Sequence, residues 1–196
     1  MKVHVIYAHP VDESFSAAIH RTVIETLIRS GHEVRDLDLY ACGFDPRLSR
    51  QELLAHYTPG LNEVGVSDHV ENLRWADALV FLFPTWWYGM PAILKGYLDR
   101  VWLPGVAFHL PADGGRIRPG LTNIAKLAAV TTHGSPWWFM KFWMREPSKA
   151  VVFRGLKPLL APGCRTAWLA HGSMDKSTPK SRQRFLAKIE RTFSRF

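Results

Sequence analysis

Three short segments, 9–16, 84–91 and 131–136, hold residue types that can bind a polar, aromatic ligand. The first and third combine imidazole and hydroxyl groups, which form hydrogen bonds with the anionic or carbonyl part of a ligand. The second holds three consecutive aromatic residues, whose flat side chains stack on planar heterocycles. These residue types indicate a binding site for a planar heterocycle that also carries an anionic group.

The spacing of the remaining reactive residues excludes several other chemistries. The sequence has no GxGxxG dinucleotide fingerprint and no GxSxG nucleophile elbow. Gly115 and Gly120 have the spacing of a P-loop, but Leu121 stands where that motif requires lysine. No group of His, Cys and carboxylate residues has metal-ligand spacing, so we expect no metal. Because no nucleophile or base stands out, a bound cofactor is expected to carry the chemistry.

The elements that must position these segments alternate between strand and helix. The expected strands are 3–8, 33–40, 78–83, 124–132 and 165–170, and the expected helices are 15–30, 66–75, 91–102, 137–158 (broken near Pro147) and 179–196. Residues 41–62 are expected to be irregular, and residues 103–122 to form a Gly/Pro-rich loop. The run 78–83 has no polar alternation, which is typical of a central parallel strand, whereas the half-polar 33–40 indicates a sheet edge.

This alternation predicts an α/β fold, a doubly wound sandwich with a five-stranded parallel sheet. In such sheets, ligands bind outside the carboxyl ends of the strands. The three segments follow the first, third and fourth expected strands. We therefore expect them to meet at one edge of the sheet.

Each segment also has a purely structural interpretation. Ser14 would cap the first helix, although the free amides of that helix end would equally bind an anion. Trp86 and Trp87 would fill the core between helices. A lone histidine such as His133 is more often structural than catalytic, and 171–173 is interpreted as a turn.

The composition is that of one globular domain, expected over residues 1–196. Of the 196 residues, 47% are hydrophobic and 21% are charged, which excludes disordered and fibrous classes. The longest apolar run, 78–83, is far shorter than a membrane span, and no signal peptide is expected, because a strand-like segment directly follows Lys2. Cys42 and Cys164 form no disulfide framework, so we expect a cytoplasmic protein.

The net charge of +8 is unevenly distributed along the chain. Residues 1–75 carry 7 Lys/Arg against 11 Asp/Glu, whereas residues 176–196 carry 7 against 1. Such a basic end can attract nucleic acid, anionic lipid or phosphorylated ligands, but a solvated helix face would also explain it. No recognition motif supports nucleic acid, so we expect no nucleic-acid partner and no membrane contact beyond peripheral docking.

The strongest family signal is the long segment 83–101, together with Ala8-His9-Pro10, Ser14-Phe15-Ser16, Thr131-Thr132 and Gly134-Ser135. In these residues the sequence resembles the flavodoxin-like NAD(P)H:quinone oxidoreductase family, the DT-diaphorase type with its smaller bacterial relatives. Residues 104–108 resemble the family's loop over the active site. The resemblance implies strand order 2-1-3-4-5, bound FAD (alternatively FMN) and a homodimer. It also implies ping-pong hydride transfer from NADH or NADPH to a small quinone-like acceptor.

The resemblance, carried over residue by residue, assigns a flavin site and a substrate pocket. The flavin phosphate would be held by His9, Ser14, Phe15 and Ser16, the ring by Pro84, Thr85, Trp86, Trp87, Tyr88 and Gly89, and its polar edge by Thr131, Thr132, His133 and Gly134. The substrate pocket would be lined by Trp87, Phe108, His109 and Phe139.

Two departures from the family pattern concern catalysis. His133 stands where the family commonly has a second glycine. In the larger members a tyrosine and a histidine assist hydride transfer, and their places fall on Phe139 and Arg145. Since phenylalanine cannot donate a proton, we expect help from the backbone amides of residues 132–134 and from the catalytic side chains His133 and Arg145.

Other functions fit parts of the same sequence. An azo- or nitro-compound reductase would look almost identical, because the flavin does the chemistry. Some members of the broad family are ancillary regulatory subunits of potassium efflux antiporters, and the basic segment 176–196 could serve such docking. A flavodoxin-type electron carrier fits less well, since those carriers are typically acidic.

Overall fold

The computed structural model describes residues 1–111 and 114–196, and its centre is a five-stranded sheet. The strands are β1 (Lys2–Tyr7), β2 (Glu33–Asp38), β3 (Ala78–Pro84), β6 (Lys126–Thr132) and β7 (Arg165–His171). They lie in the order β2-β1-β3-β6-β7, and all neighbouring pairs are parallel. Because β6 and β7 are the fourth and fifth strands of this sheet along the chain, the predicted α/β sandwich with order 2-1-3-4-5 is confirmed.

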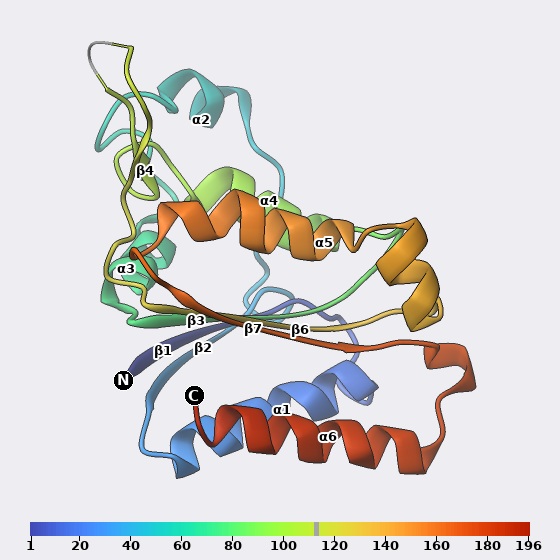
Figure 1. Ribbon diagram of the computed structural model, residues 1–196. Helices are drawn as coiled ribbons and strands as arrows, with labels where there is room; N and C mark the ends of the chain where they lie inside the picture. Colours follow the sequence, from blue (N-terminus) through green and yellow to red (C-terminus); the bar gives the residue numbers. More distant parts are fainter. Residues whose placement is uncertain (112–113) are drawn as a thin grey trace.

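Helices cover both faces of the sheet (Figure 1). One layer consists of α1 (Phe15–Arg29) and α6 (Pro179–Phe193), and the other contains α3 (Ser67–Trp75), α4 (Ala92–Val101), α5 (Pro147–Ala150) and the π-helical turn η2 (Val151–Leu156). The apolar residues of α1 recur at four-residue spacing, so that Ile19, Val23 and Leu27 are buried on one side. They pack with Phe185 and Ile189 of α6 in a single core cluster.

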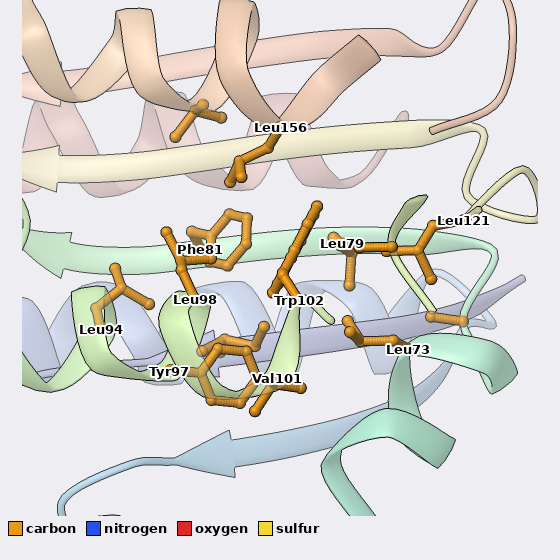
Figure 2. Close-up of a cluster of buried hydrophobic side chains, with 14 of the residues drawn as sticks. Leu73, Leu79, Phe81, Leu94, Tyr97, Leu98, Val101, Trp102, Leu121 and Leu156 are labelled. Carbon is orange, nitrogen blue, oxygen red and sulfur yellow. The ribbon is translucent and has the colours of Figure 1, made fainter. Parts of the chain in front are cut away.

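β3 lies at the centre of the fold because both of its faces are buried. Every residue from Ala78 to Pro84 is buried, as the uninterrupted apolar run predicts. On the side of α4, Phe81 packs among Tyr97, Leu98 and Trp102 (Figure 2). A strand held on both faces fixes the position of the loop that follows it, and this loop is one of the three candidate segments.

α4 also lies against the irregular segment that follows β2. A Cβ atom added to Gly96 would overlap the carbonyl oxygen and the side chain of Pro46. Arg100 donates to the carbonyl of Asp45 and forms an ion pair with Glu52 at 2.6 Å. Gly96 thus allows a close approach of backbone to helix, which Arg100 reinforces one turn further along.

A helix that the sequence interpretation missed, α2 (Arg50–Ala55), interrupts the segment 41–62. Its first turn has a capping box, in which the Ser49 hydroxyl accepts from the Glu52 amide and the Glu52 carboxylate accepts from the Ser49 amide. The prediction of an irregular segment was therefore wrong at these residues. The Ser-x-x-Glu spacing was the available signal.

Two further segments differ from the expectation in detail. The predicted loop 103–122, of which residues 112–113 lie outside the described residues, contains an antiparallel pair, β4 (Phe108–His109) with β5 (Arg118–Pro119). The predicted helix 137–158 is divided among the π-helical turn η1 (Phe139–Trp143), α5, η2 and the start of the 3-10 helix η3 (Lys157–Leu159). The longest helices, α1 and α6, have 15 residues each, and within the described ranges no helix is both long and apolar enough to cross a bilayer.

Candidate cofactor site

The amino end of α1 offers two unpaired amides at the carboxyl edge of the sheet. Ser14 caps the helix, since its hydroxyl oxygen accepts from the Ala17 amide at 3.1 Å. The amides of Phe15 and Ser16 have no backbone acceptor among the described residues, as is usual in a first helical turn. They lie at the positive end of the helix dipole, so they can bind a phosphate while Ser14 caps the helix.

The ring of His9 is oriented by the same loop. Its Nδ1 accepts hydrogen bonds from the Val11 amide and the Ser14 hydroxyl, each at 3.1 Å. The neutral ring therefore carries its proton on Nε2, which can donate to a ligand. Burial lowers the pKa of His9, so the neutral form predominates at pH 7. The centroid of the ring lies 6.1 Å from that of Trp86, which brings the first segment beside the second.

Residues 86–89 form a tight turn with two strained central residues. The backbones of Trp86 and Gly89 exchange hydrogen bonds of 3.1 and 2.9 Å, while Trp87 and Tyr88 have φ angles of 49° and 63°. This left-handed conformation favours Asn and Gly and costs a bulky residue about 1–3 kcal/mol. Trp87 is 96% exposed, and neither central amide has a backbone acceptor in the described part of the chain. Both amides can therefore bind the polar atoms of a planar ligand.

The third segment is joined directly to the second. The Thr85 amide donates to the Thr132 carbonyl at 2.7 Å, and the hydroxyls of Thr85 and Thr131 form a hydrogen bond of 2.8 Å. Thr131 and Thr132 are both buried. The Thr131 hydroxyl and the Thr132 carbonyl therefore hold the two loops side by side.

His133 is buried and held from two sides. Its Nδ1–H donates to the Ser135 carbonyl at 2.7 Å, and its ring packs against Gly172, where a Cβ atom would lie 2.6 Å from Cε1. Burial lowers the pKa of His133, so the ring is neutral at pH 7. The His133 amide donates to the His171 carbonyl at 3.0 Å. This amide is therefore not free to bind a ligand, contrary to the expectation for residues 132–134. The Gly134 amide has no backbone acceptor in the described ranges.

A cavity of about 420 Å³ opens between these segments, a volume that suits a planar heterocycle. It is lined by Thr85, Trp87, Tyr88, His133, Gly134, Ser135, Met140 and Asp175. A Cβ atom on Gly134 would lie 3.3 Å from the Asp175 carboxylate, so the glycine keeps this side of the cavity open. Five predicted flavin-site residues are thus brought to one cavity. Across residues 1–111 and 114–196, no group of three or more His, Cys, Asp or Glu could hold a metal ion.

The two residues at the places of the family's proton-handling pair lie beside this cavity. Phe139 contacts Tyr88, with ring centroids 6.1 Å apart. Arg145 and Glu146 form a second left-handed pair, with φ angles of 56° and 49°. Glu146 is paired with Lys149 at 2.8 Å, and Arg145 is exposed, with no ion pair among the described residues. Its guanidinium therefore has no carboxylate partner among the described residues, but Arg145 does not line the cavity.

Phe108 and His109 lie away from the cavity, at the opposite end of α4. α4 starts at the carboxyl edge of the sheet and runs back for 10 residues, about 15 Å. β4 follows the far end of α4 and lies near α2 in Figure 1. Within one chain, these two predicted pocket residues are therefore not brought to the cavity.

Several residues around the cavity were not singled out by the sequence interpretation. The Ser148 hydroxyl is buried and donates to the Tyr88 carbonyl at 3.3 Å, which ties α5 to the strained turn. Met140 and Asp175 line the cavity. The segment 171–173, interpreted as a turn only, also supports the third loop, because the Ser173 amide donates to the Ser135 carbonyl. No sequence signal marks Ser148, since its partner is 60 residues away.

The fold and the loops at this edge are those of a known family. Residues 1–161 match the family described as having a flavodoxin-like fold, so the chain belongs to that family. Human ribosyldihydronicotinamide dehydrogenase (quinone) is 32% identical over 166 residues, which are 76% of this chain and 70% of that protein. The ribosyldihydronicotinamide dehydrogenase-like protein traD of Penicillium crustosum is 37% identical over 125 residues, 56% of this chain and 47% of that protein.

Several solved structures match nearly the whole chain. The NAD(P)H:quinone oxidoreductase from Methanothermobacter marburgensis has a TM-score of 0.85 and 26% identity, and covers 99% of this chain and 98% of its own. The fungal relative is longer, since this chain spans about half of its length. The similarity therefore covers the complete sheet and all three loops of the candidate site.

Proposed function

We propose that this chain is a flavin-dependent NAD(P)H dehydrogenase that reduces quinones or similar small acceptors. The observation that supports it best is the cavity of about 420 Å³ between the strained turn 86–89 and the loop 133–135, next to the α1 amino end. The names of the human dehydrogenase and of the Methanothermobacter marburgensis oxidoreductase both specify quinone, which supports this reaction.

The residues present fit a flavin. The amides of Phe15 and Ser16 suit its phosphate, and the amides of Trp87 and Tyr88 suit the polar edge of its ring. Flat aromatic side chains beside those amides suit stacking. FAD is the first assignment and FMN the alternative, with NADH or NADPH as the hydride donor.

When bound, the flavin would take a hydride from NAD(P)H and deliver two electrons to the acceptor. The chain would orient the ring and exclude water from it. The Gly134 amide and His133 would lie at the edge where negative charge develops, and a negative charge nearby raises the pKa of an imidazole. Trp87 and Phe139 would act as walls for the acceptor.

The same arrangement supports a homodimer. Large aromatic residues are exposed around the cavity, namely Trp86, Trp87, Trp137, Trp138, Phe142 and Trp143. A symmetric interface would bury this surface, which is larger than a single domain usually exposes. Phe108 and His109, remote from the cavity in their own chain, would then contribute to the cavity of the second copy.

The flavin content and the kinetics of the purified protein test the proposed function. We expect one noncovalent flavin per chain, identified by mass spectrometry after release, and oxidation of NADH or NADPH by a panel of quinones. Because donor and acceptor would use one cavity in turn, initial-rate plots should give parallel lines. A colourless protein that takes up neither FAD nor FMN contradicts the proposal, and faster turnover of azo dyes than of quinones favours the azoreductase alternative.

A second prediction concerns His133. Replacing it with glycine, His133→Gly, should slow flavin reduction by NAD(P)H about 10-fold, equivalent to about 1.4 kcal/mol of barrier, without releasing the flavin. Arg145→Ala should change the rate less, because Arg145, unlike His133, does not line the cavity. Stopped-flow absorbance measures both rates. The opposite order would assign the charge-stabilising role to Arg145.

A further inference from the structure

The cations on the two sides of the sheet differ in how many of them form ion pairs. On the side of α3, α4 and α5, five cations are paired with carboxylates, namely Arg47–Asp45, Arg74–Glu63, Lys95–Asp99, Arg100–Glu52 and Lys149–Glu146, while others in the described ranges, such as Arg145, are not. On the opposite side, the segment 176–196 carries Lys176, Lys180, Arg182, Arg184, Lys188, Arg191 and Arg195. None of these seven has an ion pair with any described residue.

Five of these cations lie on α6, the helix that forms the outer layer with α1 (Figure 1), and all five are exposed: Lys180, Arg182, Arg184, Lys188 and Arg191. Phe185, Ile189 and Phe193 are buried against the sheet and α1. Arg184 and Lys188 are four residues apart and both exposed, and Arg191 follows on the same face. The outer surface of this layer is therefore a row of unpaired cations rather than a network of ion pairs.

A second hollow lies at the carboxyl end of α6, at the edge of the sheet opposite the candidate cofactor site. Its volume is about 200 Å³, and it is lined by Lys126, Arg165, Thr166, Ala167, Thr192, Arg195 and Phe196. Three cations and two hydroxyls offer donors for a phosphate group. The Phe196 ring, 5.2 Å from the Lys126 Nζ, adds an apolar wall beside them.

We propose that the outer face of α6 and this hollow form a docking surface for an anionic phospholipid bilayer. The row of cations would lie on the anionic headgroups, and one headgroup phosphate would enter the hollow. Clusters of Lys and Arg on a helix are attracted to anionic lipid surfaces. A nucleic acid is disfavoured, because bases stack on exposed aromatic residues, and the large aromatic residues that are exposed in the described ranges gather at the cofactor edge, with the exception of Tyr57.

Vesicle binding tests this surface without any measurement of catalysis. We expect the full chain to sediment with phosphatidylcholine vesicles that contain about 30 mol % phosphatidylglycerol at about 0.05 M salt, and to be released at about 0.5 M salt. Each cation at such a surface contributes about fivefold in partitioning. The triple variant Arg184→Gln/Lys188→Gln/Arg191→Gln should therefore bind about 100-fold more weakly. The double variant Arg165→Gln/Arg195→Gln should bind about 25-fold more weakly.

A charge-matched control separates this surface from net charge. The triple variant Arg47→Gln/Arg50→Gln/Lys95→Gln removes three exposed cations from the other layer and should bind within about twofold of the parent chain. Equal losses in both triple variants would overturn the proposal, as would binding to pure phosphatidylcholine with equal strength. Absence of vesicle binding at low salt, or tighter binding to RNA, would also overturn it. None of these outcomes depends on a bound flavin, so the proposed function is tested separately.

Discussion

Replacing Ser14 with aspartate, Ser14→Asp, is expected to weaken flavin binding on the order of 100-fold, equivalent to about 3 kcal/mol. Aspartate caps helices as well as serine does, so the bond to the Ala17 amide can be retained. The added carboxylate would lie beside the free amides of Phe15 and Ser16, where we propose that the flavin phosphate binds. Two like charges a few ångströms apart in a partly buried loop repel each other strongly.

The measurement is the dissociation constant of FAD and FMN by fluorescence quenching, with the thermal stability of the flavin-free chain alongside. We would work at about pH 8, because a carboxylate next to His9 would raise the pKa of its ring and protonation would partly cancel the new charge. Ser14→Asn, a neutral cap, is the matched control and should retain flavin within about threefold. If Ser14→Asp also retains flavin, the loop is only a helix cap.

Replacing Gly96 with alanine, Gly96→Ala, is expected to destabilise the fold by about 3 kcal/mol. Within a helix the same change normally stabilises by about 1 kcal/mol, because alanine is the better helix former. Here the added methyl group would overlap the backbone and ring of Pro46, and Arg100 holds that segment against α4. Since backbone cannot move aside as a flexible side chain can, the overlap outweighs the helix preference.

Urea unfolding at pH 7 measures this effect as a lower midpoint with an unchanged slope. Gly155→Ala is a matched control, because Gly155 is also helical and a Cβ atom there would meet nothing within 4 Å. That variant should be as stable as the parent chain or slightly more stable. Equal stability of Gly96→Ala and Gly155→Ala would show that Pro46 does not press on α4.

The main elements could be predicted from the sequence because their signals are local. The unbroken apolar run 78–83 and the four-residue spacing in α1 each describe a buried face directly. The short helix α2 was missed, because its six residues bury no side chain and it is joined to α4 through the pair Glu52–Arg100. Sequence periodicity reports burial, so an element held mainly by a polar contact leaves little periodic signal.

The location of the candidate site could be predicted from the sequence, whereas the detailed contacts within the site could not. Strand order alone brings the three loops to one edge, since carboxyl ends of parallel strands meet there. The bond from Ser148 to the Tyr88 carbonyl and the position of Asp175 depend on how distant segments pack. The sequence places His133 in the loop after β6, but the hydrogen bond from its amide to the His171 carbonyl could be seen only in the structure.

The two left-handed pairs, Trp87–Tyr88 and Arg145–Glu146, have a consequence for attempts to make this protein more heat-resistant. Glycine or asparagine at these four positions would relieve about 1–3 kcal/mol of backbone strain each, so design for thermal stability alone would select them. Those substitutions would also remove the indole and phenol side chains that line the cavity. Substitutions that raise the heat resistance of the protein at this edge of the sheet would therefore change the shape of the cavity.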